Sequence, residues 1–112
     1  MIVAATRSGR GSVYGLRVRE EDRSIWFAPG WRWVTVWLDE GIWPAAIPVT
    51  ASFWEESPEL RSPRLKGFLE RLGLERWEGG RPPHFHMEPL GGGAFRLEWL
   101  EHRRTQPRLP IG

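Results

Sequence analysis

The 112-residue chain contains no cysteine, which excludes disulfides, thiolate metal ligands and thiol nucleophiles. It also has no run near the roughly 18–20 consecutive apolar residues that a membrane-spanning helix requires. The N-terminal segment lacks the charged and apolar regions of a secretory signal peptide. We therefore expect a cytoplasmic protein that does not act at a membrane.

The motifs that usually carry catalysis are also missing. The sequence has no G-x-S-x-G elbow, Walker loop, H-E-x-x-H or dinucleotide-binding fingerprint. The triple glycine 91–93 precedes a strand-like segment rather than a helix, so it is better explained as a hairpin loop than as a phosphate cradle. Glu55 and Glu56 are typical of surface acids near a helical turn. The sequence predicts a protein that is not an enzyme and needs no cofactor.

A metal site has one weak candidate. His84 and His86 have strand spacing, so their rings leave the same face, where Glu88 or His102 would have to complete the ligand set. Two histidines are too few, and neither additional residue has convincing spacing. We expect no metal, with metal binding at this pair kept as the alternative.

Lysine is almost absent, since fifteen arginines and Lys66 supply all 16 basic side chains against 14 acids. Their distribution is uneven: residues 38–60 carry acids without a base, whereas both ends of the chain are basic. Such asymmetry is typical of proteins that contact polyanions. The basic arms contain Arg7, Arg10, Arg17 and Arg19 at one end and Arg103, Arg104 and Arg108 at the other.

Tryptophan is the residue in excess, with eight in the chain. Trp31, Trp33 and Trp37 share one parity of the strand-like run 31–38, so we expect their rings to project from one face of a sheet. Each ring buries roughly 150–250 Å² when covered, and a soluble monomer rarely leaves a patch above about 300–600 Å² exposed. This tryptophan stripe must pack internally, bind a second chain or stack on a ligand.

Strands are expected at 13–19, 24–28 and 31–38, with an acidic turn after the first. Pro29-Gly30 separates the second strand from the third and would place Trp26 opposite Trp33, on the same face as the stripe.

The prolines in 42–48 favour an edge strand or an irregular backbone there. The alternation of apolar and polar residues over 47–54 predicts a further strand. One helix is predicted to begin at Ser62 as N-cap and to end at Gly73. A shorter helical turn is predicted at 57–58. The principal helix would bury one face, formed by Leu65, Phe68, Leu69 and Leu72.

The last hairpin has the strongest pattern. With 91–93 as its loop, one face is wholly apolar and the other carries complementary pairs. The predicted partners are Phe85 with Trp99, His86 with Glu98, Met87 with Leu97, and Glu88 with Arg96.

These elements predict an α+β fold: five to seven antiparallel strands in a small bent sheet or half-open β-barrel, with one principal helix. A half-open barrel also covers the apolar face opposite the stripe. Residues 1–101 would form a single domain, followed by a basic tail at 102–112.

The start of the predicted helix carries three cations beside Ser62, which would form a phosphate site if they converged on one anion. The alternative is that Glu55, Glu56 and Glu59 neutralise them. The three cations are Arg61, Arg64 and Lys66.

We expect a non-catalytic nucleic-acid-binding or adaptor domain, because aromatic rings beside arginines hold single strands by stacking and charge. The alternative is a protein-interaction subunit, a homodimer or part of a larger complex, that buries the stripe. The expected nucleic-acid-binding residues are Arg7, Arg10, Arg17, Arg19, Trp31, Arg32, Trp33, Arg61, Ser62, Arg64, Lys66, Arg103, Arg104 and Arg108.

Overall fold

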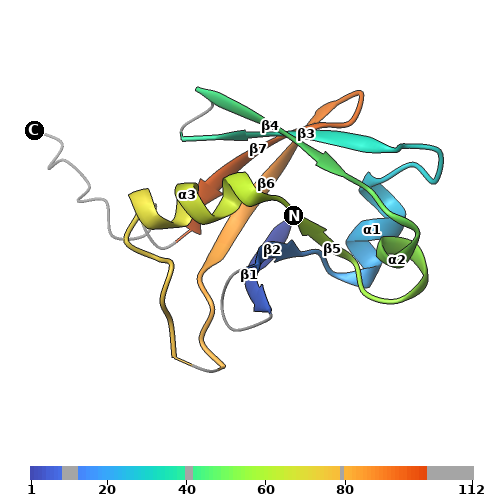
Figure 1. Ribbon diagram of the computed structural model, residues 1–112. Coiled ribbons are helices and arrows are strands. Elements are labelled where there is room, and N and C mark those ends of the chain that lie inside the picture. The colour runs from blue at the N-terminus through green and yellow to red at the C-terminus, as the bar shows by residue number, and fades with distance from the viewer. Residues whose placement is uncertain (9–12, 40–41, 79, 101–112) are drawn as a thin grey trace, which may run out of the picture.

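The computed structural model describes residues 1–8, 13–39, 42–78 and 80–100 as an α+β half-barrel built on one seven-stranded sheet (Figure 1). The strand order is β4-β3-β7-β6-β1-β2-β5. Every strand pair is antiparallel except β3–β7, which is parallel, so the sheet is mixed rather than wholly antiparallel as predicted. The strands are β1 (Ile2–Ser8), β2 (Val13–Arg17), β3 (Trp33–Leu38), β4 (Trp43–Pro48), β5 (Glu59–Arg61), β6 (His84–Gly91) and β7 (Ala94–Trp99).

The predicted helix is confirmed as α3 (Pro63–Arg71). The Ser62 side chain accepts a hydrogen bond from the Arg64 backbone N–H at 3.2 Å, and Gly73 adopts a φ of 71° just beyond the helix. Leu65, Phe68 and Leu69 are buried against the inner face of the sheet. This helix therefore closes one side of the half-barrel core.

The hairpin β6–β7 has the predicted register: Phe85 lies opposite Trp99 and Met87 opposite Leu97, and the two polar pairs alternate with these apolar pairs. Its apolar face lies in the core. A bulge between Pro89 and Gly91 shortens the loop, and Gly91, Gly92 and Gly93 all adopt positive φ.

The strand predicted at 24–28 is wrong, because residues 24–26 belong to helix α1 (Glu20–Trp26) and residues 27–28 are in no strand. The three acids assigned to a turn form the helix's first turn, where the helix dipole favours negative charge. Trp26 consequently lies on a helix and does not face Trp33. Phe27 follows the helix and enters the core.

The strand predicted at 47–54 is also wrong. The edge strand β4 ends at Pro48, and helix α2 (Ala51–Glu55) follows, with Phe53 buried in the core. The alternation of apolar residues was too short to distinguish a strand from a single helical turn. The helical turn predicted to start at 57–58 is absent, since these residues belong to no helix and lead directly into β5.

The described residues thus form two short helices in addition to α3. Within these residues, no helix is long and apolar enough to cross a membrane.

The tryptophan stripe is smaller than predicted. Val34, Val36 and Leu38 of β3 face the core, so Trp33 and Trp37 project from the outer face. The third ring, on Trp31, precedes the strand and packs edge-on against Phe27 and Phe95, with centroids 6.3 and 6.5 Å away.

Candidate binding groove beside α3

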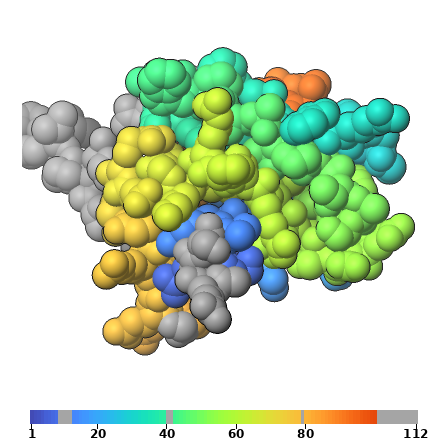
Figure 2. Space-filling view, viewed as in Figure 1, coloured from blue at the N-terminus to red at the C-terminus, as the bar shows by residue number. Residues whose placement is uncertain are grey.

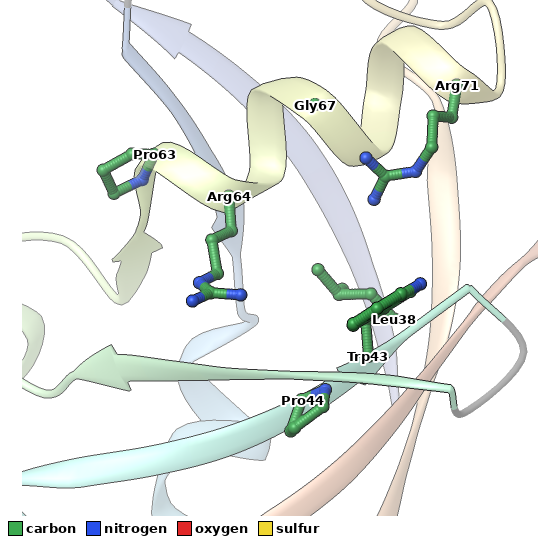
Figure 3. Close-up of a pocket in the computed structure, with 7 residues that line it drawn as sticks. All are labelled: Leu38, Trp43, Pro44, Pro63, Arg64, Gly67 and Arg71. Carbon is green, nitrogen blue, oxygen red and sulfur yellow. The ribbon is translucent and has the colours of Figure 1, made fainter.

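A groove of about 400 Å³ lies between α3 and the tip of the β3–β4 hairpin (Figure 3). The Arg64 and Arg71 side chains descend from the helix, and the Trp43 indole rises from the strands toward them, whereas the Pro44 ring lies on the far side of its strand. Its lining residues are Leu38, Trp43, Pro44, Pro63, Arg64, Gly67 and Arg71.

The register of the β3–β4 hairpin places Trp43 in this groove. Trp43 pairs with Leu38, so both side chains leave the inner face of the sheet. Leu38 is buried, but Trp43 lies at the hairpin tip, beyond the core, and remains 57% exposed. Its ring is therefore available to a ligand on the helix side of the sheet.

The spacing along α3 brings two guanidinium groups to the same groove. Arg64 and Arg71 are seven residues apart, about two helical turns, and therefore share a face. Gly67 lies between them, where glycine costs roughly 1 kcal/mol relative to alanine. A Cβ at this position would meet Nη1 of Arg71 at 3.3 Å, so the missing side chain keeps the groove open.

The two arginines differ in their partners. Arg71 donates from Nη2 to Oδ2 of Asp39 at 2.6 Å, which occupies one of its five N–H donors. The Arg64 guanidinium has no hydrogen bond or ion pair to the described residues. The groove thus offers an exposed indole with uncommitted guanidinium donors, which suits a ligand that is both planar and anionic.

A second depression of about 250 Å³ lies on the other side of the first turn of α3. It contains Arg61 and Lys66, whereas Arg64 lines the groove, so the structure divides the three cations that were expected to converge on one anion. Ser62 is occupied as the helix cap. The lining residues are Val13, Tyr14, Arg61, Ser62, Pro63 and Lys66.

A charged cluster at the opposite edge of the sheet is partnered within the chain. Glu59 is only 8% exposed; it accepts a hydrogen bond from Thr6 at 2.5 Å and ion-pairs with Arg61 at 3.2 Å and Arg17 at 3.8 Å. Burial raises the pKa of Glu59, but these donors outweigh it and hold the pKa below its ordinary value. Glu59 therefore neutralises part of the predicted basic surface. For Arg61 this agrees with the alternative expectation that nearby glutamates neutralise the cations at the start of the helix.

The described arginines of the N-terminal arm do not meet the tryptophan stripe. Arg7 lies 4.6 Å over the Trp77 ring and donates to backbone carbonyls, and Arg19 is the N-cap of α1. Strand β2, which carries Arg17, is separated from β3 by three strands. The other predicted cations, Arg10, Arg103, Arg104 and Arg108, lie outside the described residues.

The predicted stacking residues, Trp31 and Trp33, do not lie together either. Trp33 is 61% exposed on the outer face, and Arg32 beside it is exposed, whereas Trp31 is half-buried in the core packing described above. Trp43 and Arg71 were not among the residues predicted from the sequence. The seven-residue spacing of Arg64 and Arg71 was a detectable signal, but the position of Trp43 depends on the hairpin register.

Among the residues that the structure describes, no cluster of three or more His, Cys, Asp or Glu side chains is placed to hold a metal. His86 lies opposite Glu98 in the hairpin, as predicted. Comparisons with protein-family models, curated proteins and solved structures find no match to this chain.

Proposed function

We propose that this protein is a non-catalytic domain that binds single-stranded nucleic acid in the groove between α3 and β4. The observation that carries the proposal is the exposed Trp43 ring in the same groove as the guanidinium groups of Arg64 and Arg71. Aromatic stacking combined with cationic contacts to the backbone is the usual physical basis of single-strand binding.

The size of the groove supports a nucleotide as the bound unit. A volume of about 400 Å³ falls within the roughly 300–1,000 Å³ typical of small-molecule sites. Stacking of one base on an aromatic ring contributes about 1–3 kcal/mol and tolerates any base. The planar guanidinium donors match phosphate oxygens in a bidentate manner.

The side chains of the groove favour binding over catalysis. Its lining consists of aliphatic residues, an indole and two arginines, and arginine stays protonated at every physiological pH. Among the described residues that line the groove, none carries the imidazole, carboxyl or amino group that usually serves as a general acid or base.

The test compares Trp43→Ala with Trp33→Ala. Both rings are more than half exposed on the same hairpin, but they lie on opposite faces, so Trp33 is a matched control. Titration with a short oligothymidylate should show affinity falling about tenfold for Trp43→Ala and less than about twofold for Trp33→Ala. Equal losses, or no binding by the unmodified protein at low salt, would refute the proposal.

The outer face of β3 supports a second candidate, a protein-interaction subunit. Trp33 pairs with Pro48 and Trp37 with Pro44, which gives an apolar surface that contains the 61%-exposed Trp33 ring. Exposed aromatic residues of this kind are enriched at protein interfaces. Size measurement over a range of concentrations should then detect a dimer that dissociates in Trp33→Ala, whereas a monomer at every concentration contradicts self-association.

A further inference from the structure

The groove and the depression on the other side of α3 share one residue. Pro63 lines both, and α3 runs between the β3–β4 hairpin on one side and β2 on the other (Figure 2). From this arrangement we propose a binding track across the first turn of α3. The bound nucleic-acid strand passes with its backbone over Pro63 and places nucleotides in two hollows: the groove is the first hollow and the depression is the second. This inference rests on the proposed function and extends it to the path and length of the ligand.

The charges are placed on both sides of the crossing. Arg64 and Arg71 line the first hollow, and Arg61 and Lys66 line the second. A chain of phosphates that crosses between them meets cations before and after Pro63. A helix with its side chains is about 10–12 Å wide, so only an extended polyanion, and not a single nucleotide, reaches both hollows.

The second hollow has an apolar wall for a base or sugar. Val13 is 43% exposed, and the Tyr14 ring beside it is fixed because its hydroxyl donates to the Glu75 carbonyl at 2.7 Å. A wall that is already ordered loses little conformational entropy when a ligand packs on it.

Lys66 is the uncommitted cation of this second hollow. Arg61 is ion-paired with Glu59, whereas Lys66 has no ion pair or hydrogen bond to the described residues. An exposed ammonium group of this kind binds phosphate as a point charge. Lys66 should therefore contact a phosphate that a mononucleotide bound at Trp43 does not reach.

Pro63 suits the crossing point between the two hollows. It occupies the first position of α3, where its missing N–H removes no helical hydrogen bond, and it is exposed. The nucleic-acid backbone can pack over its ring without burying an unpaired donor.

The experiment is a length series of oligothymidylates from one to about six nucleotides, titrated at low salt and followed by nuclear magnetic resonance. Affinity for the unmodified protein should rise about tenfold between one and three nucleotides and then level off. Lys66→Ala should remove most of this gain and leave mononucleotide affinity within about twofold, and Lys66→Arg should restore the gain. Trp43→Ala should weaken binding at every length.

The control variant is Arg96→Ala, which removes one exposed cation from the outer face of β7. It should leave the length dependence unchanged. A polyglutamate peptide of matched charge tests for an acidic protein partner, and its binding as tightly as the oligonucleotide would overturn the inference.

The outcomes separate the two proposals. If no oligonucleotide binds, the proposed function fails. If oligonucleotides bind but affinity does not depend on length, or Lys66→Ala behaves like Arg96→Ala, the track is wrong and the Trp43 groove remains.

Discussion

The two edge strands of the sheet, β5 and β4, differ in whether their polar and aromatic side chains have partners within the chain. In β5, the Glu59 carboxylate is only 8% exposed, accepts hydrogen bonds from Thr6 and Arg61, and forms ion pairs with Arg61 and Arg17. Beside β4, Trp43 is exposed, and Arg64 across the groove has no partner among the described residues. Charges that are paired internally stabilise the fold, whereas exposed and unpaired groups are free to bind a ligand.

The edges also differ in how they avoid pairing with other chains. Strand β5 is only three residues long. The Val49 backbone N–H, just after β4, donates a hydrogen bond to the Arg32 carbonyl, just before β3. Because backbone N–H groups point to alternate sides along a strand, the backbone nitrogens of Pro44, Ala46 and Pro48 point away from β3. Two of these three positions lack an N–H, which blunts the edge against strand addition. We therefore expect partners to bind the faces of this hairpin and not its edge.

The largest expected effect is at the β5 side, in Gly15→Ala. A Cβ at residue 15 would lie 2.7 Å from Oγ1 of Thr6 and 2.9 Å from both Oε1 of Glu59 and the Leu60 carbonyl. We expect the free energy of unfolding to fall by about 3 kcal/mol, measured by urea denaturation. Gly30→Ala is the control, since nothing lies within 4 Å of its Cβ. Equal stability of the two variants would contradict the close packing at β2–β5.

The next effect is that of Glu59→Gln, which should reduce stability by about 2 kcal/mol at neutral pH. Because folding lowers the pKa of Glu59, its contribution is fully present above the unfolded value near 4.5 and is lost as pH falls through the folded pKa. The difference between the two proteins should therefore shrink on acidification below about pH 4.5. Denaturation across this range measures it, and a constant difference would show that the carboxylate charge is not the cause.

On the β4 side, Gly67→Ala should have a smaller effect and the opposite sign. Alanine raises helix propensity by about 1 kcal/mol, and its Cβ displaces only the flexible tip of Arg71, 3.3 Å away. We expect a modest gain in unfolding free energy together with a loss of oligonucleotide affinity of about threefold, because Arg71 moves within the groove. Unchanged affinity would show that Arg71 does not contact the ligand.

The correctly predicted parts of the fold have strong local signals. Helix α3 combines a capping serine, a proline at its first position and a glycine beyond its end. The β6–β7 register follows from four residue pairs that agree at once. Both patterns span enough residues for a single structure to satisfy them.

The errors fall where the pattern is short or non-local. Helices α1 and α2 contain seven and five residues, and α1 has no buried residue whose spacing would reveal it. The groove unites Leu38, Trp43 and Pro44 with residues of α3, and only the docking of α3 against the hairpin brings them together. Sequence patterns identified Arg64 as a candidate but gave no means of pairing it with Trp43.

The smallest expected effect comes from Asp39→Asn, which removes the one ion pair between α3 and the described part of the hairpin tip. Asp39 has a φ of 50°, a left-handed conformation that asparagine also tolerates, so the backbone should keep its shape. Arg71 is 55% exposed, and the loss of stability should be about 0.5 kcal/mol and should disappear at high salt.

Oligonucleotide binding distinguishes two roles for this ion pair. If Asp39 competes with phosphate for Arg71, Asp39→Asn should raise affinity about twofold more than Glu70→Gln, which removes a similar charge from the exposed part of α3. We expect this result, because Asp39 engages the same guanidinium that the ligand needs. A decrease in affinity would instead mean that Asp39 holds Arg71 in its binding position, and the groove would then depend on an internal contact as the β5 edge does.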